Sequence, residues 1–217
     1  MFPFPFSFFG AAAADVPLEL IDNNFAMEFD GTDEYVETNH NNIFDFGTSD
    51  FAISAWVKTT GTTSQHRTVV CKQNPGSSGQ WSLQVNTNGV VNFYANNGAI
   101  DVVSTTTVND GNWHNILIQR TGNVFDLYID KVLRDTETAA GQVLNNTQNL
   151  RIGRRATGYD AYFIGDIDEV AIWNKALALE DVQTIYNATN DNPGKCANLF
   201  TGGLKNGLQY WNRMGDN

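Results

Sequence analysis

Most of the chain consists of short segments in which apolar and polar residues alternate, separated by turns rich in Gly and Asn. A period of two residues is typical of β-strands that place one face against a core. The segments lie at 25–29, 51–58, 68–71, 80–85, 90–95, 99–104, 116–118, 124–129, 132–136, 150–153 and 164–173. So many strands at this spacing predict an all-β sandwich of two antiparallel sheets.

One segment has a helical period instead. Its apolar residues recur on one side of a helix predicted over 179–187, namely Leu179, Val182, Ile185 and Tyr186. Ala178 precedes this helix at the position where Ser or Thr would cap it, which costs about 1 kcal/mol. The pattern therefore predicts one short, poorly capped helix near the C-terminal end of the sandwich.

The strand predicted over 164–173 carries the most informative chemistry. Strict alternation places Ile167, Glu169, Ala171 and Trp173 on one face, and Asp166, Asp168, Val170 and Ile172 on the other. Val170 and Ile172 look like a core row, so Asp168 is expected at the end of a buried row. A carboxylate there needs a cation or several hydrogen-bond donors to offset its desolvation.

Composition narrows the function classes. The chain has 217 residues, 41% hydrophobic and 17% charged, with a formal net charge of -11. This excess of acid argues against nucleic-acid binding, which needs clustered Lys and Arg. No stretch has the apolar length of a membrane span. We therefore expect a globular, acidic domain with no nucleic-acid partner.

The two ends of the chain differ from the middle. We expect an extended Phe/Pro-rich N-terminal arm (1–22), a sandwich domain (23–190) and an extended C-terminal tail (191–217). The arm is expected to anchor a partner, because its aromatic side chains favour burial, these being Phe2, Phe4, Phe6, Phe8 and Phe9. A cleaved secretory signal ending in the AAAA run is the alternative.

Six motifs occur in an order that resembles a known family. They are AMEFDGTDEYVE, FAISAWVK, DGNWHNILI, FDLYIDKVL, NLRIGR and GDIDEVAIWNKALALEDVQTIY. Together they resemble the laminin-G-like branch of the concanavalin A-like jelly rolls, over about residues 24–187. The resemblance implies a jelly-roll sandwich with one curved sheet. Lys131 departs from the pattern, since relatives usually have Gly in that hairpin.

The resemblance also implies a structural calcium site. Many relatives hold calcium between the FDG turn and the Asp of the GDIDE strand, which here are Asp30 and Asp168. Asp33 and Asp166 are nearby candidates, and all four offer the oxygen ligands that calcium prefers. The alternative is that Asp168 accepts backbone N–H groups and holds the turn without metal.

Catalysis is not expected. Related glucanases use carboxylates spaced E-x-D-x-E on one strand face, and GDIDE has a similar appearance. On strict alternation, however, Glu169 points away from Asp168, and Val170 takes the third position on that face. Retaining hydrolysis needs two carboxyl groups about 5 Å apart on one face. We therefore predict no enzyme.

Glycan binding requires an aromatic platform with amide and carboxylate neighbours. The candidate platforms lie near Asn-rich loops and are Trp81, Tyr94, Tyr159 and Tyr162. Each of these rings also suits packing across the sandwich. Both interpretations stay open at this point.

Two functions from different classes follow. The first is a structural and interaction module displayed on a larger assembly, a phage or virus particle in our leading hypothesis, as capsid decoration or a fibre-like component. Its partners would be copies of itself or other virion proteins. The second is a carbohydrate-binding module of a secreted or cell-surface protein. Either one predicts a location on a virion or an extracellular surface.

Overall fold

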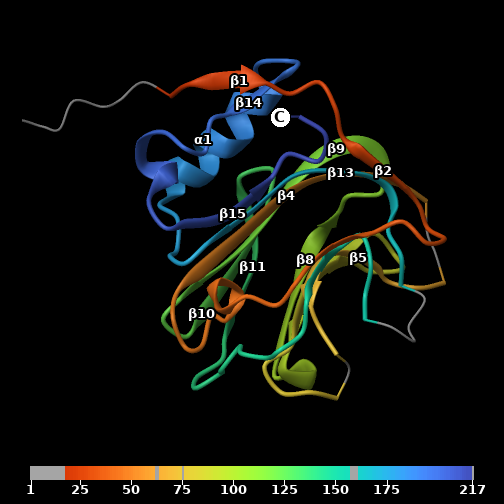
Figure 1. Cartoon of the computed structure of the whole chain (residues 1–217), viewed down its shortest axis with the longest axis vertical. Helices are drawn as coiled ribbons and strands as arrows, with labels where there is room; N and C mark the ends of the chain where they lie inside the picture. Colours follow the sequence, from red (N-terminus) through yellow and green to blue (C-terminus); the bar gives the residue numbers. More distant parts are fainter. Residues whose placement is uncertain (1–17, 62–63, 75, 157–160, 217) are drawn as a thin grey trace, which may run out of the picture.

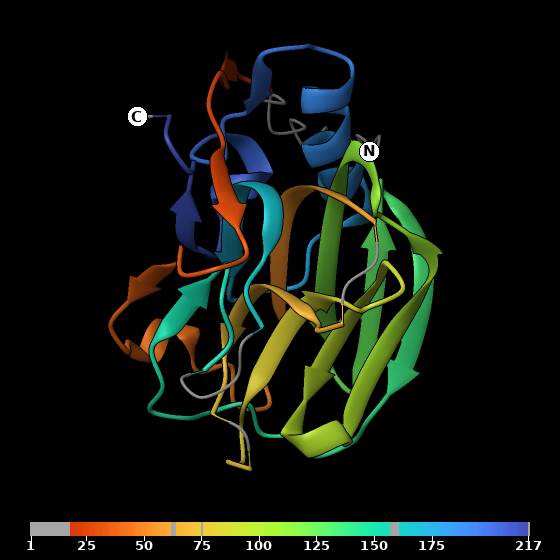
Figure 2. The ribbon, with the colours of Figure 1, turned by 90° about the vertical axis from the view of Figure 1, so that its right-hand side faces the viewer.

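Two large antiparallel sheets lie face to face in the computed structural model, which describes residues 18–61, 64–74, 76–156 and 161–216. The seven-stranded sheet has the order β11-β10-β9-β4-β13-β15, with β2 also paired to β13. The six-stranded sheet has the order β3-β12-β5-β6-β7-β8 and stands in front in Figure 2. The predicted jelly-roll sandwich is confirmed.

The strand bounds agree with the alternating segments. The seven-stranded sheet contains β2 (Met27–Asp30), β4 (Phe51–Thr60), β9 (Asp110–Thr121), β10 (Val124–Ile129), β11 (Val132–Thr138), β13 (Ile164–Trp173) and β15 (Leu208–Asn212). The six-stranded sheet contains β3 (Val36–Thr38), β5 (Arg67–Lys72), β6 (Trp81–Val85), β7 (Val90–Ala95), β8 (Ile100–Thr107) and β12 (Leu150–Ile152). The turn between β10 and β11 places Lys131 at a φ of 62°, where Gly would be less strained.

The main core lies between the two sheets. Alternate residues of β4 point into it, so that Phe51, Ile53, Ala55 and Val57 are all fully buried there. Aromatic rings pack at its centre, where Phe51 lies with its ring centroid 4.2 Å from that of Phe46. Removing this apolar area from water is the main force that holds the sheets together.

A second apolar layer covers the outer face of the seven-stranded sheet. It comprises α1 (Leu179–Asn190) and the two-stranded ribbon of β1 (Leu20–Asp22) and β14 (Lys195–Ala197), both at the top of Figure 1. Trp173 is fully buried beneath this layer with Val182. Both faces of the sheet are therefore covered, which explains why every residue of β4 from Phe51 to Val57 is buried. The helix begins where predicted, and Ala178 provides no side-chain cap.

The C-terminal segment was predicted to be an extended tail, and this prediction is wrong. Its described residues, 191–216, are part of the fold. The segment provides β14, and its later strand β15 pairs with the outer half of β13, from Val170 to Trp173. The physical reason is that β15 is apolar on both sides. Tyr210 packs against Phe44 at 5.6 Å between ring centroids, whereas Trp211 packs against the outer layer.

Candidate functional site

A β-bulge in β13 sets the geometry of the site. The pairing with β4 shifts between Asp168 and Ala171, and Glu169 takes a φ of 51°. Strict alternation was therefore the wrong prediction for this strand. Ile167 and Val170 both point into the main core, and Asp168 lies on the opposite, outer face.

Asp168 is 5% exposed although it lies on the outer face. One carboxylate oxygen accepts the side-chain N–H of Asn23 at 2.9 Å, and the other accepts the backbone N–H of Glu169 at 2.8 Å. Among the described residues, no Lys or Arg forms an ion pair with it. Burial raises the pKa of Asp168 to about 7, and the charge of Glu169 adds to the rise.

The carboxylate of Glu169 points toward the C-terminal segment. It accepts the indole N–H of Trp211 at 2.6 Å and pairs with Arg213 at 3.3 Å. Burial raises its pKa, while these two partners act in the opposite direction. The bulge thus brings two consecutive carboxylates toward the outer layer, so the expectation that Glu169 points away from Asp168 to the other face was wrong.

Strand register builds the floor of the site as two rows across the sheet. In the first row Asp168 of β13 lies beside Trp56 of β4. In the second row Lys58 of β4 lies between Asp166 of β13 and Trp113 of β9. Trp56 is nearly buried, with its ring stacked on Tyr186 of α1 at 5.7 Å. Trp113 is 39% exposed. It is therefore an indole that a ligand can reach, next to charged groups.

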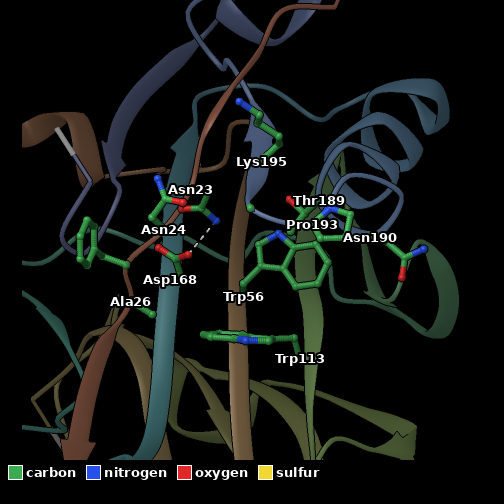
Figure 3. A pocket seen from close by; sticks show the side chains of 12 residues that line it. Asn23, Asn24, Ala26, Trp56, Trp113, Asp168, Thr189, Asn190, Pro193 and Lys195 are labelled. Carbon is green, nitrogen blue, oxygen red and sulfur yellow. Dashed lines mark hydrogen bonds between the residues drawn. The ribbon is translucent and has the colours of Figure 1, made fainter.

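Above this floor is a cavity of about 420 Å³, hereafter the tryptophan groove. Figure 3 shows Trp56 and Trp113 one above the other, with Asp168 directed toward Asn23 and Trp56. One wall is the connector that precedes β2, residues 23–26. The other wall is the end of α1 and the turn before β14, with Thr189, Asn190 and residues 193–195.

Backbone and side-chain hydrogen bonds hold the walls in place. The backbone N–H of Asn23 donates to the Gly194 carbonyl at 2.9 Å and joins one wall to the other. Asp216 accepts the backbone N–H groups of Asn24 and Phe25 at 2.9 and 3.0 Å. The C-terminal residues therefore fix the connector that lines the groove.

Two side-chain oxygens in the walls lack partners. Asn23 Oδ1 and Thr189 Oγ1 are shielded from solvent and have no hydrogen bond within the part of the chain that the structure describes. Shielded polar atoms in proteins are normally satisfied by a protein group or an ordered water. The groove therefore has unused hydrogen-bonding capacity.

The four predicted calcium ligands do not converge on one site. Asp166 forms an ion pair with Lys58 at 3.3 Å, and Asp168 lies in the groove. Among the described residues, one cluster of three or more His, Cys, Asp or Glu side chains has its potential ligand atoms within 4.8 Å of one another. It comprises Asp30, Asp33 and Glu34. These exposed carboxylates suit a hard cation chemically, although Asp30 Oδ1 already accepts the Thr32 N–H at 2.7 Å.

The predicted aromatic platforms lie elsewhere. Trp81 is fully buried in the main core, so its ring has no surface to offer a glycan, and that prediction is corrected. Tyr94 lies on the six-stranded sheet opposite Ser82 and Asp101. The Tyr162 ring lies under the Arg154 guanidinium, 5.0 Å from it. Tyr159 and the five Phe residues of the arm lie outside the described residues.

The residues that sequence reasoning missed are Trp56 and Trp113. The sequence predicted a strand over 116–118 only, whereas β9 begins at Asp110 and includes Trp113. The register with Lys58 shows that Trp113 flanks a cavity. The available clue was that Trp113 lies an odd number of residues before the buried Ile116 and Ile118. Because side chains alternate between the two faces of a strand, this spacing assigns Trp113 to the outer face.

No helix within the described ranges has the length and apolar content to cross a membrane.

A family model described as the concanavalin A-like lectin/glucanases superfamily matches residues 30–183. No curated protein matches the sequence. Among the described lining residues of the groove, both walls lie outside the matched range, whereas Trp56, Trp113 and Asp168 lie inside it.

Solved structures share the fold at low sequence identity. A Bacteroides ovatus protein provisionally assigned to carbohydrate binding has a TM-score of 0.68 at 12% identity, covering 90% of this chain and 53% of its own. Domain 4 of an extracellular arabinanase from Geobacillus stearothermophilus, solved with arabinotriose, has a TM-score of 0.58 at 19% identity. The match covers 76% of this chain and 79% of the arabinanase domain chain. The binding domain of botulinum neurotoxin serotype G has a TM-score of 0.57 at 12% identity. The match covers 80% of this chain and 47% of the neurotoxin chain. This chain thus spans about half the length of the first of these structures.

Proposed function

The chain belongs to the concanavalin A-like lectin/glucanases superfamily, and from this membership we propose that it is a non-enzymatic module that binds carbohydrate in the tryptophan groove. The carbohydrate-related neighbours support this reading over display on a virus particle. Their low sequence identity means that they support the fold directly and the ligand class only by analogy.

The observation that carries the proposal is the composition of the groove. Sugar rings present apolar C–H faces, which stack on indole rings, and hydroxyl edges, which bond to carboxylates and amides. Trp113 supplies an exposed indole, Asp168 a carboxylate and Asn24 and Asn190 side-chain amides, all around one cavity of about 420 Å³. That volume lies within the usual range for small-molecule sites.

Binding without hydrolysis suits the carboxylates. Among the described residues that line the groove, Asp168 is the one carboxylate. Glu169 is occupied by Trp211 and Arg213. Asp166 is paired with Lys58. Hydrolysis requires a second carboxylate acting on the same bond as the first. We therefore assign Asp168 to hydrogen bonding with ligand hydroxyls.

The test is a carbohydrate-binding measurement with matched variants. Glycan-array hits are titrated by isothermal calorimetry with the whole chain, with Trp113→Ala and with Phe200→Ala. Phe200 is 61% exposed and does not line the groove, so it controls for loss of an exposed ring. We expect Trp113→Ala to weaken binding at least tenfold and Phe200→Ala to leave it unchanged. Equal affinities for all three proteins would refute the assignment of the groove.

Display on a phage or virus particle stays a prediction. It depends on the Phe-rich arm, which lies outside the described residues. The three solved structures described above are not virion proteins. Deleting residues 1–10 and measuring self-association or particle association tests it. Unchanged assembly of the shortened chain would contradict anchoring by the arm. A surface-displayed module and a carbohydrate-binding module are compatible, and both place the protein at a virion or extracellular surface.

A further inference from the structure

The charges around the tryptophan groove are unequal. Asp168 lies on its floor without a cationic partner among the described residues. Asp216 lies behind the wall of residues 23–26, and its charge contributes to the raised pKa of Asp168. The groove therefore contains one uncompensated acid and has a second one close behind it.

The lysines near the groove do not reverse this balance. Lys195 lines the groove but pairs with Asp22 of β1. Lys58 lies beside Trp113 and pairs with Asp166 at 3.3 Å. Each cation thus already has an acidic partner of its own. An anionic ligand would therefore meet lysines whose positive charge is already balanced by a neighbouring carboxylate.

The hydrogen-bond acceptors of the groove also favour a neutral ligand over an anionic one. Each oxygen of Asp168 accepts one hydrogen bond, from Asn23 or from the Glu169 backbone. A carboxylate oxygen can accept two. Asn23 Oδ1 and Thr189 Oγ1 are further acceptors without a partner in the described ranges. A sugar hydroxyl group can donate to the free lone pairs of the Asp168 carboxylate, whereas a sugar carboxylate cannot.

Resting on the proposed function, we propose that the tryptophan groove selects neutral saccharides and rejects acidic ones, with Asp168 as the residue that sets this specificity. A carboxylate on the ligand within about 10 Å of Asp168 costs a factor of roughly ten or more in affinity at an effective dielectric constant of ~20. The walls that complete the groove lie outside the family-matched residues 30–183, whereas Asp168 lies inside them.

Matched pairs of ligands test this inference. Each neutral oligosaccharide is paired with the backbone of the same linkage and anomeric configuration oxidised to the uronic acid at C6, for example β-linked glucan with β-linked glucuronan and β-linked mannan with β-linked mannuronan. Both members are titrated against the whole chain by calorimetry at pH 8 and low salt. We expect the neutral member of the binding pair to bind at least tenfold tighter. Asp168→Asn should narrow that gap by strengthening binding of the acidic member.

Three other outcomes contradict the account in separable ways. If the acidic member binds as tightly or more tightly, and Trp113→Ala abolishes that binding, the selectivity is overturned and the groove assignment stands. If Trp113→Ala does not affect either member, the groove assignment itself fails. If no member of any pair binds, the carbohydrate-binding function fails, and the selectivity fails with it.

Discussion

Replacing Asp168 by Asn should stabilise the protein, and more so at high pH. The carboxylate is 5% exposed and lacks a cationic partner in the described part of the chain, so ionising it in the folded state is unfavourable. Asn is nearly isosteric and never ionises. Its carbonyl can accept the Glu169 N–H, and its amide can donate to Asn23 Oδ1 after that side chain rotates. The substitution therefore removes a charge without removing the hydrogen bonds.

The size of the effect follows from the pKa. Burial raises the pKa of Asp168 from 3.8 to about 7, a rise of about three pH units. At about 1.4 kcal/mol per unit, the difference between folded and unfolded states amounts to at most about 4 kcal/mol. At pH 3 and below the group is largely protonated in both states. As pH rises to 7 the unfolded chain releases the proton first, so this group lowers the free energy of unfolding.

Urea unfolding at pH 4.5 and pH 8 measures this difference. Asp168→Asn should be more stable than the wild type by about 1 kcal/mol at pH 4.5 and by a few kcal/mol at pH 8. The exposed Glu28→Gln serves as the control, with a change below about 0.5 kcal/mol at both pH values. The reasoning would be refuted if Asp168→Asn had the same effect at both pH values, or if it destabilised the protein at pH 8.

Three further predictions concern other parts of the molecule. Trp211→Phe removes the indole donor to buried Glu169 and should lower the free energy of unfolding by about 1–3 kcal/mol in urea; no loss would argue against this bond. Phe51→Ala opens the fully buried core and should cost about 3–5 kcal/mol, whereas Phe200→Ala, 61% exposed, should cost under about 1 kcal/mol; equal losses would contradict the core assignment. Calcium should raise the melting temperature of the wild type but not of Asp30→Asn, and a melting curve unchanged by a chelator would contradict the structural calcium.

The fold could be predicted from the sequence because its information is local. Alternation in segments such as 51–58 marks strands, and the apolar stripe of α1 marks the helix. The C-terminal segment was mispredicted because its structure depends on information that is not local. Whether LQYWN extends away or adds a strand depends on which edge of the sandwich is open, and this depends on residues far away in sequence.

The site could be predicted only in part. Asp168 was identified from its position in an apolar strand, but its face was wrong because a bulge at Glu169 adds one residue to the alternation. Glu169 is not a Gly, so its positive φ has no local sequence mark. Trp113 was missed because its neighbours are set by register across three strands. Part of one wall of the groove, residues 193–195, comes from the segment that the sequence suggested was a tail.

The most direct measurement is a crystal structure of the whole chain with an oligosaccharide identified on the glycan array. The account predicts a sugar ring stacked on Trp113, with at least one hydroxyl donating to Asp168 and the ring enclosed by the walls of the tryptophan groove. A sugar bound instead on the outer face of the six-stranded sheet beside Tyr94, with the groove containing only water, would contradict it.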